Sequence, residues 1–380
     1  MYATCLSTKP GESRLMNLQS REIGETKELA VAGTRQVVHA VCYRIAVNSD
    51  VGFHINIDGR EKDEITESIT DQTYSFPASF QLLDELVGQG HRILDLGAHV
   101  GTFSLLAAAL GYSVVSVEAS PSSAALLTAS ARKNGFDNMQ VVPKAVSDHG
   151  GTLEFISAGP YGLVANPFLE DPTISVPATT VDTLLADIGW DHVDFVKMDV
   201  EGAEVAAIRG MSELLAREDA PILLYESNGH TLHYFGETPG SLMAALEQFD
   251  YQSYLVEGDR LIPTRAGDLQ PEVCVDYLAT QRVLDTVAGW RIVGPMSEDE
   301  RMTRILESLV HPNEHARKYI ARALGDADES VISGLQLALL EKDAEIARLR
   351  ALLEGYERGL FIRTMRTLHD LWNRVSSWMR

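Results

Sequence analysis

Short runs of apolar, β-branched residues alternate with segments of helical spacing along the middle of the chain. The apolar runs predict strands at 92–96, 113–118, 140–145, 193–198, 221–226, 252–257 and 273–278, with an extra strand at 152–156. The helical segments predict helices at 103–110, 122–133, 203–216 and 240–249. Strands and helices that alternate at this length are typical of an α/β fold with a parallel sheet and helices on both faces. In such folds the ligand binds at the carboxyl ends of the strands.

The flanking segments follow different patterns. Residues 1–35 are polar and irregular and predict a partly disordered lead-in, whereas 37–67 alternates like a β hairpin that turns at 48–50. The patterns divide the chain into four parts: a lead-in and hairpin segment (1–75), an α/β domain (76–280), a helical linker region (281–330) and a helical tail (331–380).

The tail contains apolar residues at alternating spacings of three and four over 332–379. This repeat predicts a coiled coil, and with it a homo-oligomer or a partner helix; the alternative is two helices packed against the body of the protein. Residues 358–380 contain five Arg, one Asp and two Trp. A basic amphipathic helix of this kind can lie on an anionic membrane surface, although such helices more often pack against a partner.

Composition and charge limit which partners the protein can bind and in which compartment we expect it. The 380 residues are 45% hydrophobic and 23% charged, which is typical of a folded soluble protein. A net charge of -22 makes a duplex nucleic acid an unfavourable partner. The three cysteines lie far apart, which argues against a disulfide framework or a structural zinc site. With no signal peptide pattern, we expect a cytoplasmic protein, with a peripheral contact at the inner membrane surface through 358–380 as the alternative.

The most informative motif follows the predicted strand at 92–96. Asp95, Gly97 and Gly101 form a D-x-G-x-x-x-G sequence, and Glu118 ends the next predicted strand. Glycines let the backbone turn tightly and approach a ligand, while a carboxylate at the second strand can accept hydrogen bonds from both ribose hydroxyls. No lysine of the phosphate-binding type follows the glycines. The pattern fits S-adenosylmethionine, a nucleoside cation without phosphates; the alternative is a turn that is merely tight.

Several ordered blocks resemble those of FkbM-type S-adenosylmethionine-dependent methyltransferases. The resemblance covers about 74–280 and rests on DLGAHVGTFS (95–104), VEASPSSAALL (117–127), KAVSDHGGTLEF (144–155), TTVDTLL (179–185), VDFVKMDVEGAEVAAIRG (193–210) and PILLYE (221–226). The KMDVEGAE sequence is the most specific part. One departure is His99, where the family often has Asn.

The resemblance implies a class I methyltransferase domain, a Rossmann-like doubly wound sheet of seven strands. It implies transfer of a methyl group to a hydroxyl, most readily that of a sugar in a glycan or glycolipid. O-methylation of a secondary metabolite, such as a polyketide or a glycosylated natural product, is the alternative acceptor. A coiled-coil scaffold with a vestigial methyltransferase fold is the alternative from another class.

Residues that match the family blocks are expected to hold the cofactor. The glycine loop would line its methionine and ribose portions, Glu118 would hold the ribose, and Ser120 would lie near the adenine with Ala145 or Asp148 beside it. Asp199 would face the sulfonium and the acceptor. The full expected set is Asp95, Gly97, Ala98, His99, Gly101, Glu118, Ala119, Ser120, Ala145 and Asp199.

Candidates for proton transfer cluster after the predicted strands at 193–198 and 221–226. They are Asp199, Glu226, His230 and His233. A hydroxyl becomes a better nucleophile when a nearby base accepts its proton. Asp199, Glu226 and a histidine would also suit a divalent metal, but their spacing is not diagnostic, and we expect no metal site.

Three further charged residues surround these candidates. Glu201 is a possible functional acid, whereas Glu204 is expected to be structural, complementing the N-terminus of the following helix after a turn at Gly202. Lys197 is expected to point away from Met198 and to neutralise a neighbouring carboxylate. Tyr74 and Phe76, which precede the first strand of the domain, are weaker candidates for contacts that cover the cofactor.

Overall fold

The computed structural model describes residues 19–301, with gaps at 33, 35, 48–50, 62, 77–78, 89, 157–161, 166–171, 269, 272–273 and 298–299. These residues belong to one compact unit, Tyr2–Met302. The predicted coiled coil at 332–379, the basic helix at 358–380 and most of the linker region at 281–330 lie outside the described residues.

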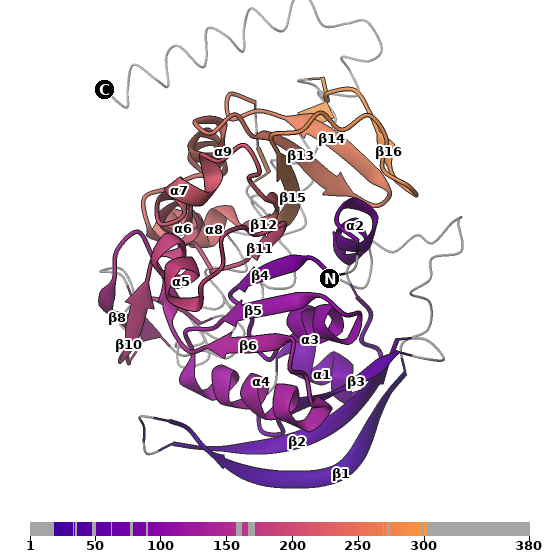
Figure 1. The fold of residues 1–380 in the computed structure, drawn as a ribbon, viewed down its shortest axis with the longest axis vertical. Coiled ribbons are helices and arrows are strands. Elements are labelled where there is room, and N and C mark those ends of the chain that lie inside the picture. The colour runs from indigo at the N-terminus through magenta and orange to yellow at the C-terminus, as the bar shows by residue number, and fades with distance from the viewer. Residues whose placement is uncertain are drawn as a thin grey trace, which may run out of the picture. The chain divides into compact units, whose positions relative to one another are not determined.

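A nine-stranded sheet forms the centre of the described unit (Figure 1). Its strands occur in the order β16 (Arg291–Ile292), β14 (Arg260–Thr264), β13 (Gln252–Glu257), β15 (Val275–Thr280), β12 (Ile222–Ser227), β11 (Phe195–Met198), β4 (Arg92–Leu96), β5 (Ser113–Val117) and β6 (Met139–Val142). The five strands from β12 to β6 run parallel, but β15 pairs antiparallel with both β12 and β13.

All seven predicted strands of the domain belong to this sheet. The predicted parallel sheet is mixed in the structure, because β15 runs antiparallel, and β14 and β16 extend it beyond β13. Local patterns reveal neither the direction of a strand nor its neighbours, because both depend on the path of the connections.

Each face of the sheet has its own hydrophobic core, since side chains alternate along a strand. Ile93 and Phe195 belong to the first core, and Leu94 and Val196 belong to the second. The helices that supply the first core are α1 (Glu64–Thr70), α2 (Ser79–Leu86), α3 (Thr102–Ala109) and α4 (Pro121–Asn134). Those that supply the second are α5 (Val181–Ile188), α6 (Glu204–Arg209), α7 (Ser212–Leu215), α8 (Gly229–Tyr234) and α9 (Pro239–Glu247).

The predicted helix at 203–216 is two short helices, α6 and α7. The chain leaves α6 at Gly210, which packs so closely on Ser147 that a Cβ there would lie 2.1 Å from the Ser147 carbonyl oxygen. The Gly210 carbonyl oxygen accepts a hydrogen bond from the Asp182 amide instead of continuing the helix. Tertiary packing therefore interrupts a segment whose apolar spacing is continuous.

A separate three-stranded antiparallel sheet precedes the domain. The predicted hairpin is present as β2 (Val37–Ala46) and β3 (Gly52–Asp58), but β1 (Gln19–Ala30) adds a strand where a partly disordered lead-in was expected. Figure 1 shows this sheet lying across α4, and the amide of Asn56 on β3 donates to the hydroxyl of Ser130 on α4 at 2.8 Å. Residues 26–28 and 30 of β1 are exposed, so the part of β1 whose side chains are described has no buried alternation to recognise.

A second small sheet lies beside α5. It contains β7 (Ala145–Val146), β10 (Ile174–Thr179), β8 (Gly151–Ile156) and β9 (Leu163–Val164). The predicted strand at 152–156 is confirmed as β8, although the prediction at 140–145 merged β6 with the start of β7. Within the described part of the chain, no helix is long and apolar enough to cross a bilayer.

Candidate active site

Alternation along four neighbouring strands brings charged side chains to one face of the sheet. Asp95 on β4 pairs with Lys197 on β11, and Glu226 on β12 pairs with Asp276 on β15. In each parallel strand, the residue two positions before the charged one belongs to the first core. Side chains two apart lie on the same face of a strand, so these charges lie on the face covered by α2 and α3. Because β15 runs antiparallel, its beginning meets the carboxyl ends of its parallel neighbours. Asp199, directly after β11, joins the same edge.

The glycine loop between β4 and α3 contacts the loop after β11 backbone to backbone. Gly97 has φ 78°, and a Cβ at this position would lie 1.7 Å from the carbonyl oxygen of Asp199. Gly101 has φ 91°, and a Cβ there would meet Leu127 at 2.1 Å. Both positions therefore require glycine. The absence of a side chain at Gly97 lets the loop lie directly beside Asp199.

Glu118 follows β5 and is held by two backbone amides. His99 and Ser120 each donate an N–H to one of its carboxylate oxygens, both at 2.7 Å. The side chain is only 7% exposed, and burial raises its pKa to about 7 even though the two amide hydrogen bonds lower it. Each oxygen keeps a second lone pair, so the oriented carboxylate can still accept hydrogen bonds from adjacent ribose hydroxyls. The glycine cradle and this acid fit a nucleoside cofactor such as S-adenosylmethionine.

Lys197 connects two carboxylates beneath the glycine loop. Its Nζ donates to Asp199 Oδ2 at 2.9 Å and lies 3.8 Å from Asp95 Oδ1. Burial alone would lower the pKa of Lys197, but the charges of Asp199 and Asp95 outweigh it and raise the pKa. Asp95 is fully buried, which raises its pKa, and its Oδ2 accepts a hydrogen bond from Ser104 at 2.5 Å. The predicted neutralising role of Lys197 is confirmed.

Three carboxylates converge where β11 and β12 end. Asp199, Glu201 and Glu226, called the acidic cluster below, each present an oxygen within 4.8 Å of the others. Burial and mutual repulsion raise the pKa values of Glu201 and Glu226 well above those of ordinary carboxyls. Burial, with a contribution from Asp199, also raises the pKa of nearby Asp276 to about 6. The carboxyl edge of the sheet is therefore strongly acidic next to the glycine loop.

A comparison with protein families identifies the domain that contains the glycine loop, Glu118 and the acidic cluster. Residues 95–253 match the model of the methyltransferase FkbM domain. This segment of the chain is an FkbM methyltransferase domain. The match begins at the aspartate of the glycine loop and includes Glu118 and the whole acidic cluster. The enzyme is accordingly an S-adenosylmethionine-dependent methyltransferase.

Solved structures offer more distant similarities. Precorrin-6y C5,15-methyltransferase from Geobacter metallireducens aligns at 13% identity over 52% of this chain and 84% of its own, with a TM-score of 0.32. The T. thermophilus 16S rRNA N2 G1207 methyltransferase RsmC, in complex with AdoMet and guanosine, aligns at 14% identity over 70% of this chain and 51% of its own (TM-score 0.32). Monomeric WbdD aligns at 16% identity over 60% and 43%, respectively (TM-score 0.33). These values say nothing about the acceptor of this chain, and no curated protein sequence matches it.

Glu204 has a structural role in the turn after β11, as predicted. Glu204 begins α6, and its Oε1 accepts hydrogen bonds from the amides of Val200 and Gly202 at 3.1 and 3.2 Å. Gly202 has φ 96°, and a Cβ there would lie 2.4 Å from the carbonyl oxygen of Thr231. The turn that carries Glu201 is thus held from inside by Glu204 and from outside by α8.

The two candidate histidines of the methyltransferase lie on α8, directly after β12. His230 and His233 are both exposed, and His230 Nε2 is 2.8 Å from the hydroxyl of Tyr234. Partial burial, and then the proximity of His233, lower the pKa of His230. Burial first, and then the charge of Asp199, raise the pKa of Glu226, although a hydrogen bond with Cys274 lowers it. A role for either histidine in proton transfer stays a prediction.

Several residues that we expected to contact the cofactor cap a helix, are buried in the fold or form ion pairs. The Ser120 hydroxyl caps α4 by accepting from the Ser123 amide, and Ala145 is buried in β7, whereas Asp148 is exposed and paired with His149. Ala98 is buried and Ala119 is partly buried against the small sheet. Their contact with the cofactor stays a prediction.

Sequence reasoning overlooked two acids near the loop. Asp276 had no visible signal, because only the antiparallel direction of β15 brings it to the site. Asp63 caps α1 with its side chain, a role signalled by the D-x-x-T pattern with Thr66. Asp63 also acts on His99, whose pKa burial lowers to about 4 despite this neighbour. His99 is therefore neutral near pH 7, with a buried Nδ1 that has no hydrogen-bond partner.

The aromatic segment before the domain lies against the glycine-loop helix. Burial raises the pKa of Tyr74, whose hydroxyl is hydrogen-bonded to Thr102 at the start of α3. Its ring contacts Phe76 edge to face at 5.3 Å. The two side chains thus lie beside the cofactor loop, and their contact with the cofactor itself remains a prediction.

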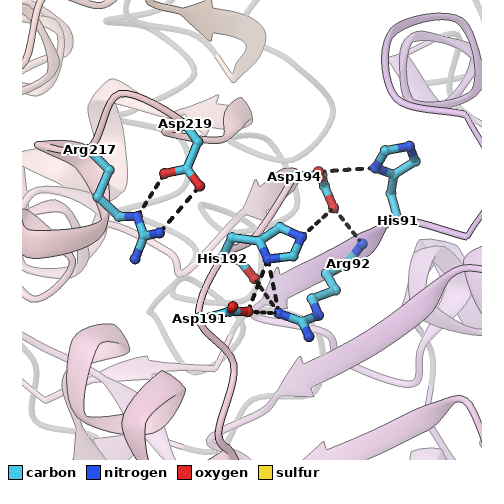
Figure 2. Close-up of polar contacts among 7 residues, drawn as sticks. All are labelled: His91, Arg92, Asp191, His192, Asp194, Arg217 and Asp219. Carbon is cyan, nitrogen blue, oxygen red and sulfur yellow. Dashed lines mark hydrogen bonds and ion pairs between the residues drawn. The ribbon is translucent and has the colours of Figure 1, made fainter.

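A second polar group lies at the opposite, amino-terminal edge of the same strands (Figure 2). The Arg92 amide at the start of β4 donates to Asp194 Oδ2 at 2.8 Å, and His91 contacts the other oxygen of Asp194 at 3.0 Å. Acidic and basic residues alternate in this group, which contains His91, Arg92, Asp191, His192, Asp194, Arg217 and Asp219. Figure 2 shows that Arg217 and Asp219 form a pair of their own, whereas the other five residues are connected by hydrogen bonds and ion pairs.

Proposed function

We propose that this methyltransferase transfers the methyl group of S-adenosylmethionine to a hydroxyl oxygen, most readily that of a sugar in a glycan or glycolipid. The supporting observation is the acidic cluster beside the glycine loop. Carboxylates accept hydrogen bonds from hydroxyls, and several of them on one edge suit an acceptor with several hydroxyls. The close backbone contact between Gly97 and Asp199 supports this proposal, because it brings the acidic edge beside the glycine loop that we expect to bind the methyl donor.

The bound cofactor supplies an electrophilic methyl carbon on a sulfonium. The residues of the chain then have three tasks. Glu118 and the glycine loop would hold the nucleoside, Asp199 would orient the acceptor hydroxyl, and a nearby base would receive the hydroxyl proton on methyl transfer. Alignment at about 3 Å supplies much of the rate enhancement, and a positioned base typically adds roughly 10²–10⁴-fold.

Glu226 is our first candidate for this base, because a carboxylate whose pKa is raised holds a proton more tightly than an ordinary one. Asp199 is engaged by Lys197, which suits it better for orienting the acceptor. His230 and His233 remain the alternatives, since a neutral imidazole can also receive the proton.

The test is label transfer from methyl-labelled S-adenosylmethionine into an extract of source cells that lack this gene. The extract is divided into lipid-linked glycan, polysaccharide, small-molecule and protein fractions, with Asp199→Asn as the inactive control. Label in a glycan fraction only with the wild-type enzyme supports the proposal. Label in the small-molecule fraction refutes the glycan acceptor in favour of a secondary metabolite. Label in no fraction, with cofactor binding confirmed by calorimetry, favours the scaffold.

The sequence of 332–379 leads us to propose self-association or a partner helix through this segment, with cytoplasmic location and a peripheral membrane contact through 358–380. Light scattering of the full chain and of a chain ending at residue 331 tests the first part. Sedimentation with anionic vesicles tests the second.

A further inference from the structure

We infer that Lys197 is a positioning residue that sets how strongly the site attracts the positive charge of the methyl donor, by holding Asp199 in an ion pair beside the glycine loop. Lys197 lies on β11, directly opposite Asp95 on β4, and Asp199 comes directly after β11. The inference rests on one part of the proposed function, the place of Asp199 beside the donor, and not on the identity of the methyl acceptor.

The ammonium of Lys197 lies among three oxygens that come from three parts of the site. Its Nζ donates to Asp199 Oδ2 at 2.9 Å and to the Gly97 carbonyl oxygen at 3.4 Å, and it lies 3.8 Å from Asp95 Oδ1. An ammonium has three N–H donors, so one side chain can serve the glycine loop, the acidic edge and the buried carboxylate of β4. Lys197 is therefore one hydrogen bond away from the backbone that we expect to bind the donor.

Buried partners hold this ammonium in place. Asp95 is fully buried, and its Oδ2 accepts a hydrogen bond from Ser104 at 2.5 Å, while the Ser104 hydroxyl lies 2.6 Å from that of Ser116. The side chains of Lys197 and Asp199 are only 20% and 31% exposed, so solvent screens their attraction less than it screens a surface pair. The ammonium therefore cancels part of the field of Asp199 next to the glycine loop.

Partial cancellation of this field suits methyl transfer. The donor carries a positive charge at sulfur, and transfer of the methyl group moves that charge away from the sulfur. An unpaired carboxylate beside the sulfur would stabilise the bound donor more than the transition state, which slows the reaction. Lys197 limits this stabilisation and keeps the Asp199 carboxylate in one orientation.

Removal of Lys197 is expected to leave Asp199 as an unpaired charge. Burial raises the pKa of Asp95, whereas Lys197 lowers it, so Asp95 takes up a proton more readily once the lysine is gone. S-adenosylmethionine should then bind more tightly relative to S-adenosylhomocysteine, which lacks the methyl group and the charge at sulfur. Structural damage to the site would weaken the binding of both ligands alike, so their relative affinity reports the charge.

Calorimetry of the full-length protein with both ligands at pH 7, without any acceptor, tests the inference. The measured quantity is the dissociation constant of S-adenosylhomocysteine divided by that of S-adenosylmethionine. Lys197→Met should raise this ratio by roughly fivefold or more. Lys133→Met, the same change at an exposed position on α4, should leave it unchanged. Because Lys197 acts through Asp199, adding Asp199→Asn to Lys197→Met should return the ratio to the wild-type value or below.

Three outcomes overturn the inference: a ratio in Lys197→Met equal to that of wild type, a raised ratio that persists in the Lys197→Met/Asp199→Asn double variant, and a wild type that binds neither ligand. Circular dichroism establishes that each variant is folded.

The single variant Asp199→Asn carries the test if Lys197→Met is unfolded or binds neither ligand. It leaves the ammonium of Lys197 with one carboxylate fewer, so the ratio should fall by roughly fivefold or more, and an unchanged ratio overturns the inference. Since no acceptor is present in these measurements, their outcome is separable from that of the label-transfer experiment.

Discussion

Replacing Glu118 by glutamine is expected to stabilise the fold at alkaline pH while weakening cofactor binding. Glu118 is 7% exposed, and its two oxygens accept the amides of His99 and Ser120. Its pKa rises from 4.5 to about 7 because burial disfavours the charged form more than the two amides favour it. The native state therefore contains a carboxylate whose ionisation costs stability.

The magnitude follows from proton linkage. Between pH 4.5 and 7 the native carboxyl binds more protons than the unfolded one, so stability falls as the pH rises through this window. At about 1.4 kcal/mol per pKa unit, the full loss above pH 7 is about 3 kcal/mol, of which about 2.5 kcal/mol falls between pH 5 and 8. Glutamine has no such titration, but one backbone amide would face its NH₂ group, at a pH-independent cost of about 1–3 kcal/mol.

Urea unfolding of wild type and Glu118→Gln at pH 5 and pH 8 measures the effect. The stability of the variant relative to wild type should increase by about 2.5 kcal/mol between the two pH values, while Glu218→Gln, the same change at an exposed position before β12, shows no such trend. Calorimetry at pH 8 should show weaker binding of S-adenosylmethionine to Glu118→Gln. A relative stability that is the same at both pH values would refute the assignment of a costly buried charge to Glu118.

Three further substitutions test the site. Gly97→Ala should cost about 2–5 kcal/mol in urea unfolding, because its Cβ would lie 1.7 Å from the Asp199 carbonyl oxygen; Gly135→Ala, also at positive φ but with open space, should cost only about 1–2 kcal/mol, and equal losses would contradict the close contact. Asp199→Asn should lose at least 10²-fold in label transfer while staying folded, and near-normal turnover would remove Asp199 from the mechanism. Lys197→Met should destabilise by about 3–5 kcal/mol at pH 8 and by less as the pH falls, because burial raises the pKa of Asp95; a loss independent of pH would argue against the buried ion pair.

The strands of the sheet were largely predictable because buried apolar runs mark them. The limits of β4 and β13 agree with the predicted 92–96 and 252–257. The strands β1 and β14 escaped prediction, β1 with residues 26–28 and 30 exposed and β14 because it follows β13 after a two-residue turn. The antiparallel direction of β15 depends on the long-range path of the chain, which no local pattern contains.

The candidate site was predictable where it depends on strand ends and glycines. Acids directly after a buried strand, such as Asp199 and Glu118, must lie at the carboxyl edge. Asp276 could not be found this way, since it lies at the beginning of its strand. The convergence of Glu201 with Glu226 depends on a turn in which Glu201 has φ 51°, a conformation that its residue type does not announce.

The two glycine contacts described above also bear on how acceptor preference can be redesigned. Gly97 packs against the Asp199 carbonyl, and Gly202 packs against the Thr231 carbonyl. The segments that follow β4, β11 and β12 are therefore in direct backbone contact with one another. If one of these loops were replaced alone by a loop from another enzyme, the new loop would have to pack against a backbone that fits only the original one. Changing the specificity of this protein therefore requires moving the segments 97–101, 199–203 and 228–235 as one module.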